Sequence, residues 1–307
     1  MKLLRSASEL PSANRKVCAA IGTFDGVHLG HQQVIRQTIA DAEQCEGIPV
    51  VITFDRHPAS VVAPRRAPDL IYPLSKKLRV IESLGVHALL LIHFDRAFSE
   101  RPANDFIHGL VREFGCLNSL CVGSNFTFGR GRSGNVELLK QLGTQLGFTV
   151  HGMASVSLDG QVVSSTRVRE AIRQGHLDAA SQRLGRPYEL CGEVVRGDGL
   201  GTKLGIPTAN LDVTGLTLPP TGVYAVHPHL DGRNHRGVLN LGFRPTLKDK
   251  SPALRAEVHL LDFTGDLYGR RMDLTFVDKL RNEQKFRDLT ELKEQIHRDI
   301  ATARERF

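Results

Sequence analysis

Apolar runs and amphipathic segments alternate along the first half of the chain. Four short runs are almost continuously apolar, and they occupy residues 17–24, 48–54, 87–94 and 119–126. Such runs are typical of parallel strands that are covered by helices on both faces. Between them, segments such as 31–45 and 103–114 carry apolar residues at helical spacing. This alternation predicts an α/β fold with a doubly wound parallel sheet.

The pattern changes near residue 184. Short strand-like runs separated by Gly and Pro follow, at residues 221–228, 236–243, 255–263 and 271–280. Their spacing predicts a small antiparallel β-barrel. The last segment, 289–307, has apolar residues at helical spacing, which predicts a C-terminal helix on the barrel. We therefore predict two domains, residues 1–185 and residues 186–307.

Composition narrows the class of protein. The chain has 307 residues, of which 41% are hydrophobic and 24% charged, as in ordinary globular proteins. No apolar stretch approaches the roughly 18–20 residues of a membrane span, and the start lacks the apolar core of a signal peptide. The five cysteines are scattered and never spaced as CxxC, which argues against a disulfide framework or a zinc ribbon. A cytoplasmic location without a membrane partner is expected.

The net charge of +7 is compatible with nucleic acid and equally with small polyanions such as nucleotides. The chain has no tryptophan, and its aromatic content is 6%. It also lacks the interleaved basic and aromatic residues that stack single-stranded bases. Nucleic acid is therefore not an expected partner.

The stretch GTFDGVHLGHQQVI (22–35) is the first candidate site. It follows an apolar strand, contains three glycines and opens a helix beside His28 and His31. A helix N-terminus presents backbone N–H groups and the positive end of the helix dipole, and imidazoles can donate to phosphate oxygens. A single histidine more often caps a helix or packs in a core. The combination of features favours a triphosphate site.

A second stretch, SSTRVREAI (164–172), places three hydroxyl residues before another helix. Hydroxyls are good N-caps, but Arg167 and Arg169 would lie unfavourably near the positive end of the dipole. A bound anion would relieve that conflict. Taken alone, the stretch is better explained as an N-cap with two solvated arginines.

HLGH and SSTRVR, in this order on an α/β sheet, resemble the motifs of the HxGH nucleotidyltransferase superfamily. With TFDRHP (53–58) and GSNFTFGRGRSG (123–134), the first half resembles the adenylyltransferase half of bacterial bifunctional riboflavin kinase/FAD synthetases. The resemblance implies that an FMN phosphate attacks the α-phosphorus of ATP in line and that pyrophosphate leaves. Catalysis would then consist of positioning and charge neutralisation around Mg²⁺.

The resemblance assigns the catalytic contacts with the ATP phosphates to His28 and His31. The other implied nucleotide-binding residues of this half are Gly22, Phe24, Asp25, Gly30, Ser164, Thr166 and Arg167. The implied flavin-binding residues are Phe54, His57, Pro58, Asn125 and Phe128. Two departures concern the flavin side. Asn125-Phe126-Thr127 stands where the family more often has Asp-Phe-Arg, and Arg56 stands where Pro is more common.

The stretch GDGLGTKLGIPTANLD (197–212) is the second candidate site. It is not a Walker A loop, because Lys203 follows Thr202 and precedes Leu204. Pro207 disfavours the helix that a dinucleotide fingerprint requires. What remains is a glycine loop able to approach a phosphate, ending in a compact turn at 207–210. By itself a glycine loop is more often a plain β-turn. The oxygens of Thr208 and Asn210 suit Mg²⁺.

GEVVRGDGLGTKLGIPTANL resembles the riboflavin kinase signature, and the match continues through PPTGVYAV, GVLNLGFRPTL, AEVHLLDFTGDLYGR and LRNEQKF. The resemblance implies a six-stranded barrel in which Thr208 and Asn210 hold Mg²⁺ and Glu257 is the base for the riboflavin 5′-hydroxyl. Without the resemblance, Glu257 is better explained as a solvated strand residue. The implied nucleotide-binding residues are Gly197, Gly199, Gly201, Lys203, Pro207, Thr208 and Asn210. The implied flavin-binding residues are Arg281, Glu283 and Phe286.

The expected activity is the phosphorylation of riboflavin to FMN and the adenylylation of FMN to FAD, with Mg²⁺ and ATP. Two alternatives stay open. The chain could act on tRNA, since aminoacyl-tRNA synthetases share the HxGH motif, although SSTRVR lacks their lysine pair and no anticodon-binding helical domain follows. The barrel could instead bind flavin and regulate the transferase without catalysing a reaction.

Overall fold

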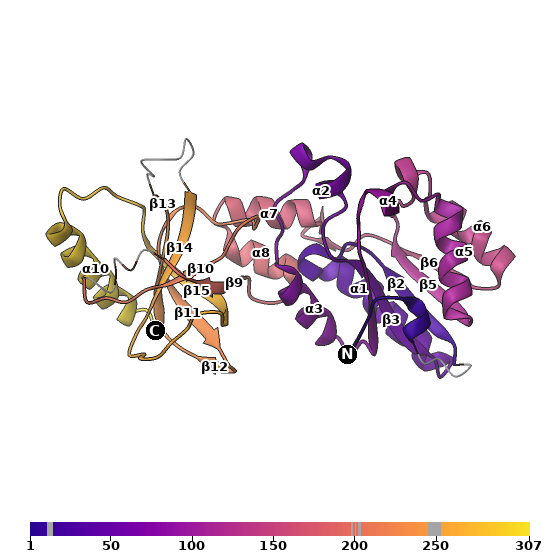
Figure 1. The fold of residues 1–307 in the computed structure, drawn as a ribbon, viewed down its shortest axis with the longest axis horizontal. Coiled ribbons are helices and arrows are strands. Elements are labelled where there is room, and N and C mark those ends of the chain that lie inside the picture. The colour runs from indigo at the N-terminus through magenta and orange to yellow at the C-terminus, as the bar shows by residue number, and fades with distance from the viewer. Residues whose placement is uncertain (11–14, 198, 200, 202–203, 245–252) are drawn as a thin grey trace. The chain divides into compact units, whose positions relative to one another are not determined.

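The computed structural model describes residues 1–10, 15–197, 199, 201, 204–244 and 253–307. The chain forms two compact units (Figure 1). The first comprises Met1–Val168 with Arg183–Gly185, and the second comprises Arg169–Gln182 with Arg186–Phe307. The division at residues 185 and 186 stays a prediction, because the segment Arg169–Gln182 groups with the second unit.

The first unit is built on a six-stranded parallel sheet of order β1-β4-β3-β2-β5-β6. Its strands are β1 (Lys2–Leu4), β2 (Val17–Ile21), β3 (Ile48–Phe54), β4 (Ala88–Ile92), β5 (Leu117–Gly123) and β6 (Thr149–Met153). The four predicted strands are confirmed. The two edge strands were not predicted, because β1 and β6 are partly exposed and lack a continuous apolar run.

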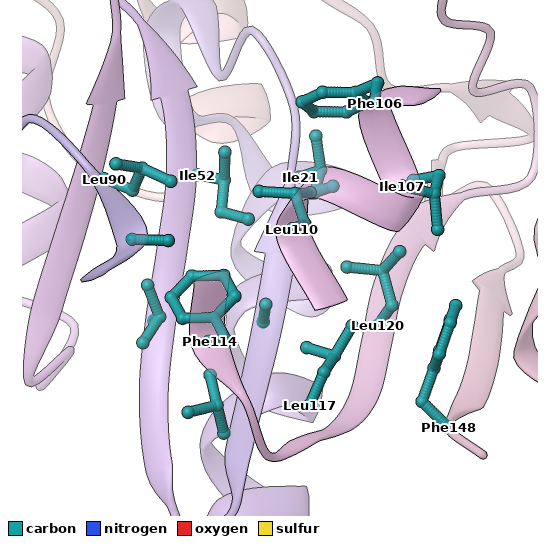
Figure 2. Packing of buried hydrophobic residues seen from close by; sticks show 14 of the residues in the cluster. Ile21, Ile52, Leu90, Phe106, Ile107, Leu110, Phe114, Leu117, Leu120 and Phe148 are labelled. Atoms are coloured by element: carbon teal, nitrogen blue, oxygen red, sulfur yellow. The ribbon is translucent and has the colours of Figure 1, made fainter. Parts of the chain in front are cut away.

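Helices cover both faces of this sheet, as the doubly wound prediction requires. On one face, Ala20 of β2 clusters with Ile35 of α1 (Leu29–Gln44) and Ile81 of α3 (Leu74–Glu82). On the other, α5 (Ala103–Phe114) and α6 (Val136–Leu146) pack against the sheet. Figure 2 shows Phe106 and Leu110 of α5 packed over Ile21 of β2. Neighbouring β2 residues therefore bury opposite faces.

Shorter helices complete the first unit and open the second. They are α2 (Ala59–Val62), α4 (Arg96–Ser99), α7 (Ser165–Arg173) and α8 (Leu177–Leu184). Helices α1 and α7 both begin beside the loop that follows β2. The Ser165 hydroxyl donates to the Asp25 carbonyl at 2.9 Å, and a Cβ at Gly30 would lie 3.9 Å from the Val163 carbonyl. The two motif-bearing helix starts are thus brought together.

The second unit is a closed antiparallel barrel. Its strands are β9 (Glu189–Val195), β10 (Ala209–Leu211), β11 (Gly222–Leu230), β13 (Gly237–Arg244), β14 (Ala253–Leu260) and β15 (Arg271–Arg281). They follow the order β11-β13-β14-β10-β9-β15, and β15 pairs again with β11, which closes a six-stranded ring. The short strand β12 (Arg233–Asn234) extends β11. This confirms the predicted barrel.

The C-terminal helix follows its prediction, and the segment 207–210 does not. Helix α10 (Leu289–Arg304) lies beside the barrel (Figure 1). Its residues Ile300 and Ala303 pack against barrel residues, as the apolar spacing predicts. The compact turn predicted at 207–210 is wrong. Ala209 and Asn210 already belong to β10. Ala209 pairs with β14, and Asn210 pairs with both β9 and β14, so antiparallel neighbours keep this segment extended.

Candidate active sites

His28 and His31 form the centre of the first candidate site. His28 is the N-cap of α1, and its Nδ1 accepts the His31 backbone N–H at 3.4 Å. Because Nδ1 is the acceptor, the proton of the neutral His28 ring lies on Nε2. The two rings stack with centroids 3.6 Å apart, and the Phe24 ring meets His31 edge-on at 5.3 Å. Two imidazoles thus stack on each other at the positive end of the α1 dipole.

Two glycines make room for these rings. A Cβ at Gly22 would lie 2.9 Å from the Phe24 ring, and a Cβ at Gly30 would lie 3.2 Å from the His28 ring. A larger residue at either position would require the neighbouring ring to shift. Gly22 and Gly30 of this motif therefore permit the close packing of the aromatic side chains.

The start of α7 contributes a second set of polar groups. Ser164 Oγ accepts the Arg167 N–H at 3.3 Å, so Ser164 caps the helix. Arg167 is half-buried, and its Nη1 donates to Gln161 Oε1 at 2.6 Å. Thr166 is exposed. The N-cap is therefore confirmed, but at Ser164 alone, since Ser165 and Thr166 already lie in α7. The expectation of two solvated arginines is wrong, because Arg169 is only 6% exposed. Anion binding at this helix start stays a prediction.

Asp25 lies at the same edge of the sheet, but its carboxylate already accepts a hydrogen bond. Only 4% of it is exposed, and its carboxylate accepts the Ile71 N–H at 3.0 Å and 3.2 Å. This ties the loop after β2 to the segment before α3. A direct contact between Asp25 and a nucleotide stays a prediction.

Phenylalanines line the carboxyl ends of the central strands. Phe54 at the end of β3 contacts Phe94 and Phe98, with centroids 5.3 Å and 6.2 Å away. Phe126 and Phe128, after β5, stack at 5.5 Å. Ligands of open α/β sheets bind outside the carboxyl ends of the strands. Of the predicted flavin residues, Phe54 and Phe128 thus lie in one aromatic cluster, where they are 8% and 9% exposed, and their contact with flavin stays a prediction.

The remaining predicted flavin residues of this half lie in loops. His57 Nδ1 accepts the Ala59 N–H at 3.1 Å at the start of α2, directly beside Pro58. Asn125 is exposed in the turn after β5. Their placement near strand ends is compatible with substrate contact, and their roles stay predictions.

The barrel contains the second candidate site, a cavity of about 390 Å³. Its lining gathers eight of the residues predicted for this half: Gly199, Gly201, Thr208, Asn210, Glu257, Arg281, Glu283 and Phe286. The volume is in the range of small-molecule sites. Lys203 lies outside the described residues. Pro207 does not line the cavity, but its carbonyl pairs with His259 Nδ1 at 2.8 Å.

Strand register explains why polar groups converge here. Glu257 of β14 lies opposite Asn210 of β10 on one side and opposite Asn240 of β13 on the other. All three residues line the cavity. A Cβ at Gly197 would collide with the Asn210 side chain, so the backbone at Gly197 approaches this side chain closely. A carboxylate and two amides therefore form one row on the inner side of the cavity.

Helix α10 provides one wall of this cavity. Arg281, at the end of β15, donates from Nε and Nη2 to the Asp299 carboxylate at 2.9 Å and 2.8 Å. The Arg281 guanidinium also lies over the Phe286 ring, 5.8 Å from its centroid. Glu283 Oε1 accepts the Phe243 N–H at 3.1 Å. The predicted flavin residues of this half are therefore held in defined positions.

Both halves of the chain match known protein families. Residues 10–167 match the family model for FAD synthetase, and residues 184–307 match the one for riboflavin kinase. The chain belongs to the bifunctional riboflavin kinase/FMN adenylyltransferase family. The Escherichia coli K12 member is 40% identical over 310 residues, which cover 100% of this chain and 98% of that protein. The Pseudomonas fluorescens member is 38% identical over 305 residues, 99% of this chain and 97% of that protein.

A solved structure supports the same fold for the whole chain. A Streptococcus pneumoniae protein described as a macrolide-efflux protein has a TM-score of 0.80 and 27% identity, and the match covers 98% of both chains. Among the residues that our structure describes, no helix combines the length and apolar content needed to cross a bilayer. The match of both halves to riboflavin kinase/FMN adenylyltransferases favours this family over the tRNA-synthetase alternative.

Some residues of these sites were missed from the sequence. Asn240 and His259 line the barrel cavity, and Lys77 lines a small cavity at the sheet edge. Asn240 had a readable signal, since it interrupts the apolar run GVLNLGF. Lys77 had none, because it lies in an ordinary amphipathic helix pattern far from any motif.

Proposed function

We propose that the first domain, residues 1–185, transfers the adenylyl group of ATP to FMN, and that the second, residues 186–307, phosphorylates riboflavin. The observation that carries this proposal is that each compact unit assembles its own set of polar and aromatic side chains. The order of the two matched family models along the chain supports the assignment.

In the first domain, an FMN phosphate oxygen attacks the α-phosphorus of ATP. The bond from that phosphorus to the α–β bridging oxygen breaks, and pyrophosphate leaves. His28 and His31, stacked at the start of α1, donate hydrogen bonds to the phosphate oxygens as charge develops. Ser164 and Arg167 hold the triphosphate from the start of α7. The aromatic cluster around Phe54 and Phe128 orients the flavin.

In the second domain, the 5′-hydroxyl oxygen of riboflavin attacks the γ-phosphorus of ATP. The bond to the β–γ bridging oxygen breaks, and ADP leaves. Glu257 accepts the hydroxyl proton, since its carboxylate lies in the same cavity as Thr208 and Asn210. Arg281 and Phe286 shape the flavin side. A barrel that only senses flavin would not need a carboxylate within this polar row.

The residues of the barrel cavity fit a magnesium ion carried with ATP. Mg²⁺ prefers oxygen ligands and keeps several waters. The Thr208 hydroxyl, the Asn210 amide and the Glu257 carboxylate supply such oxygens within one cavity. We assign the ion to Thr208 and Asn210, where it would neutralise phosphate charge. A cytoplasmic setting and the absence of a nucleic-acid partner are also part of this proposal.

Product analysis tests the proposal. The purified chain is incubated with riboflavin and MgATP, and the flavins are separated by chromatography. FMN and then FAD are expected, with ADP and pyrophosphate as the other products. If riboflavin and supplied FMN both stay unchanged, the proposed function is wrong.

A further inference from the structure

A buried lysine connects the two strand ends that lead into the adenylyltransferase site. Lys77 of α3 is only 8% exposed. Its Nζ donates to the Phe54 carbonyl at 2.9 Å, the Thr23 carbonyl at 3.2 Å and Thr53 Oγ1 at 3.2 Å. An ammonium group has three protons, so these three acceptors match its donors.

The groups that Lys77 holds precede predicted site residues on two different strands. Thr23 follows β2 and leads through Phe24 and Asp25 to His28. Phe54 ends β3 and leads to His57. Through Lys77, helix α3 therefore links the loop that leads to His28 with the strand end that leads to His57, although α3 lies far from both motifs in the sequence.

The loop after β2 needs such support. Phe24 and Val27 both adopt left-handed backbone conformations, with φ of 50° and 43°. Non-glycine residues in this region are unfavourable and persist only when their surroundings hold them in place. The Thr23 carbonyl, held by Lys77 and by the Thr53 hydroxyl at 3.2 Å, lies immediately before this strained segment.

We propose that Lys77 is a positioning residue for adenylyl transfer: its ammonium group fixes the Thr23 and Phe54 carbonyls, and through them the spacing between His28 and the flavin pocket. This inference rests on the proposed function of the first domain. A buried lysine is costly unless its charge is stabilised. Here the carbonyls and the nearby carboxylates of Asp25 and Asp55 stabilise it.

The protonation state of Lys77 predicts a specific pH dependence of adenylyl transfer. Burial lowers its pKa to about 8, although Asp25 and Asp55 oppose this shift. Loss of the proton leaves two donors for three acceptors, so one strand end is released. The other titratable or charged groups lining this small cavity are Asp25, Asp55, Arg56, His57 and Tyr72.

The test compares Lys77→Met and Lys77→Arg in the full chain. For Lys77→Met we expect kcat for FMN adenylylation to fall about 10- to 100-fold, with KM for FMN and ATP changed less than about threefold, because misplaced groups weaken mainly the transition state. Lys77→Arg should recover part of the loss. FMN formation from riboflavin should stay unchanged in both variants, as an internal control.

The pH profile separates positioning from a merely structural role. Wild-type kcat for adenylylation should decline above about pH 8, and this decline should be absent in Lys77→Arg, whose guanidinium stays charged. A decline caused by another cavity group would persist in that variant. Lys76→Met is the matched control, since Lys76 is equally buried on the same helix but does not line the cavity.

Two results would overturn the inference. One is a wild-type kcat for adenylylation in Lys77→Met. The other is a decline of kcat above about pH 8 that is unchanged in Lys77→Arg. If thermal unfolding shows that Lys77→Met does not fold, the pH profile of kcat in Lys77→Arg still tests the inference. If the wild-type chain makes no FAD from FMN, the proposed function itself fails, which is a separate result.

Discussion

At the scale of single residues, His28 shows that capping and catalysis are compatible roles. Its Nδ1 accepts the His31 N–H, while its ring stacks on the His31 ring. From the sequence, helix capping and phosphate binding are competing interpretations. The structure shows that a cap uses only one ring nitrogen, so the same side chain can cap the helix and donate from Nε2.

Replacing His31 tests the adenylyltransferase role directly. For His31→Ala we expect FAD formation from FMN to fall about 100- to 1000-fold, the usual effect of removing one donor to developing charge. FMN formation from riboflavin should not change. His108→Ala, on an exposed position of α5, is the control. Comparable adenylylation in His31→Ala and wild type would contradict the assigned role.

Replacing Glu257 tests the base of the kinase site. Glu257→Gln keeps the size of the side chain but cannot accept the hydroxyl proton, so riboflavin phosphorylation should fall roughly 100- to 10,000-fold. Supplied FMN should still be converted to FAD. Glu193→Gln, at an exposed position of β9 outside the cavity, controls for loss of a barrel carboxylate. Equal effects of the two variants would exclude Glu257 as the base.

At the scale of elements, buried polar contacts tie helices to sheets. Asp41 of α1 accepts the Ser119 hydroxyl of β5 at 2.7 Å and lies 3.3 Å from His151 Nε2 of β6. Burial raises the pKa of Asp41, but hydrogen bonds from Gln37, Ser119 and Cys121 and the His151 charge lower it overall. The carboxylate form therefore stabilises the position of α1.

This contact predicts a pH dependence of stability. The pKa of Asp41 is lower in the folded state than the roughly 3.9 of an unfolded aspartate, so its stabilisation is complete above about pH 4 and is lost as the pH falls further. Asp41→Asn should lower the unfolding free energy at pH 7 by about 1–3 kcal/mol and weaken the acid-dependent decrease of Tm. Glu43 is exposed on the same helix. Glu43→Gln should therefore change neither the unfolding free energy at pH 7 nor the acid-dependent decrease of Tm.

The Arg281–Asp299 pair predicts how α10 affects substrate binding. Asp299 is 5% exposed and receives both guanidinium bonds, and Gln295 also donates to it at 2.8 Å. Asp299→Asn cannot match a bidentate guanidinium, so Arg281 and the cavity wall should become less ordered. KM for riboflavin should rise about 3- to 10-fold, while KM for FMN in adenylylation stays constant. Glu294→Gln, on the exposed side of α10, should leave both unchanged.

At the scale of the whole molecule, the two units predict separable activities. His31→Ala should still make FMN, and Glu257→Gln should still convert FMN to FAD. A mixture of the two variants should therefore make FAD from riboflavin and MgATP at a rate that rises with protein concentration, because FMN must diffuse between chains. Chromatography of the flavins over time measures this.

A chain carrying both substitutions is the control and should make neither product. If each single variant, folded by thermal unfolding, loses both activities, the two sites are not independent. If the mixture makes no FAD although each variant keeps its own activity, FMN does not pass between chains. The experiment thus tests the separation of the sites rather than their existence.

The elements with strong patterns were predictable from the sequence. Continuous apolar runs marked β2 to β5, and turn-separated runs marked most barrel strands. The edge strands β1 and β6 were not, because exposure removes the apolar signal. The segment at 207–210 was wrongly expected to be a turn. Its proline suggested a break, but pairing on both sides of β10 decides its conformation.

The hydrogen-bonding groups that each motif offers were predictable from the local sequence, because a glycine loop or a pair of histidines at a helix start offers the same groups wherever the segment lies in the fold. The convergence of residues that are distant in the sequence was not predictable. Strand register placed Glu257 between Asn210 and Asn240, and side-chain packing placed Lys77 against the ends of β2 and β3. These arrangements depend on contacts between segments far apart in the chain, and periodicity within one segment carries no information about such contacts.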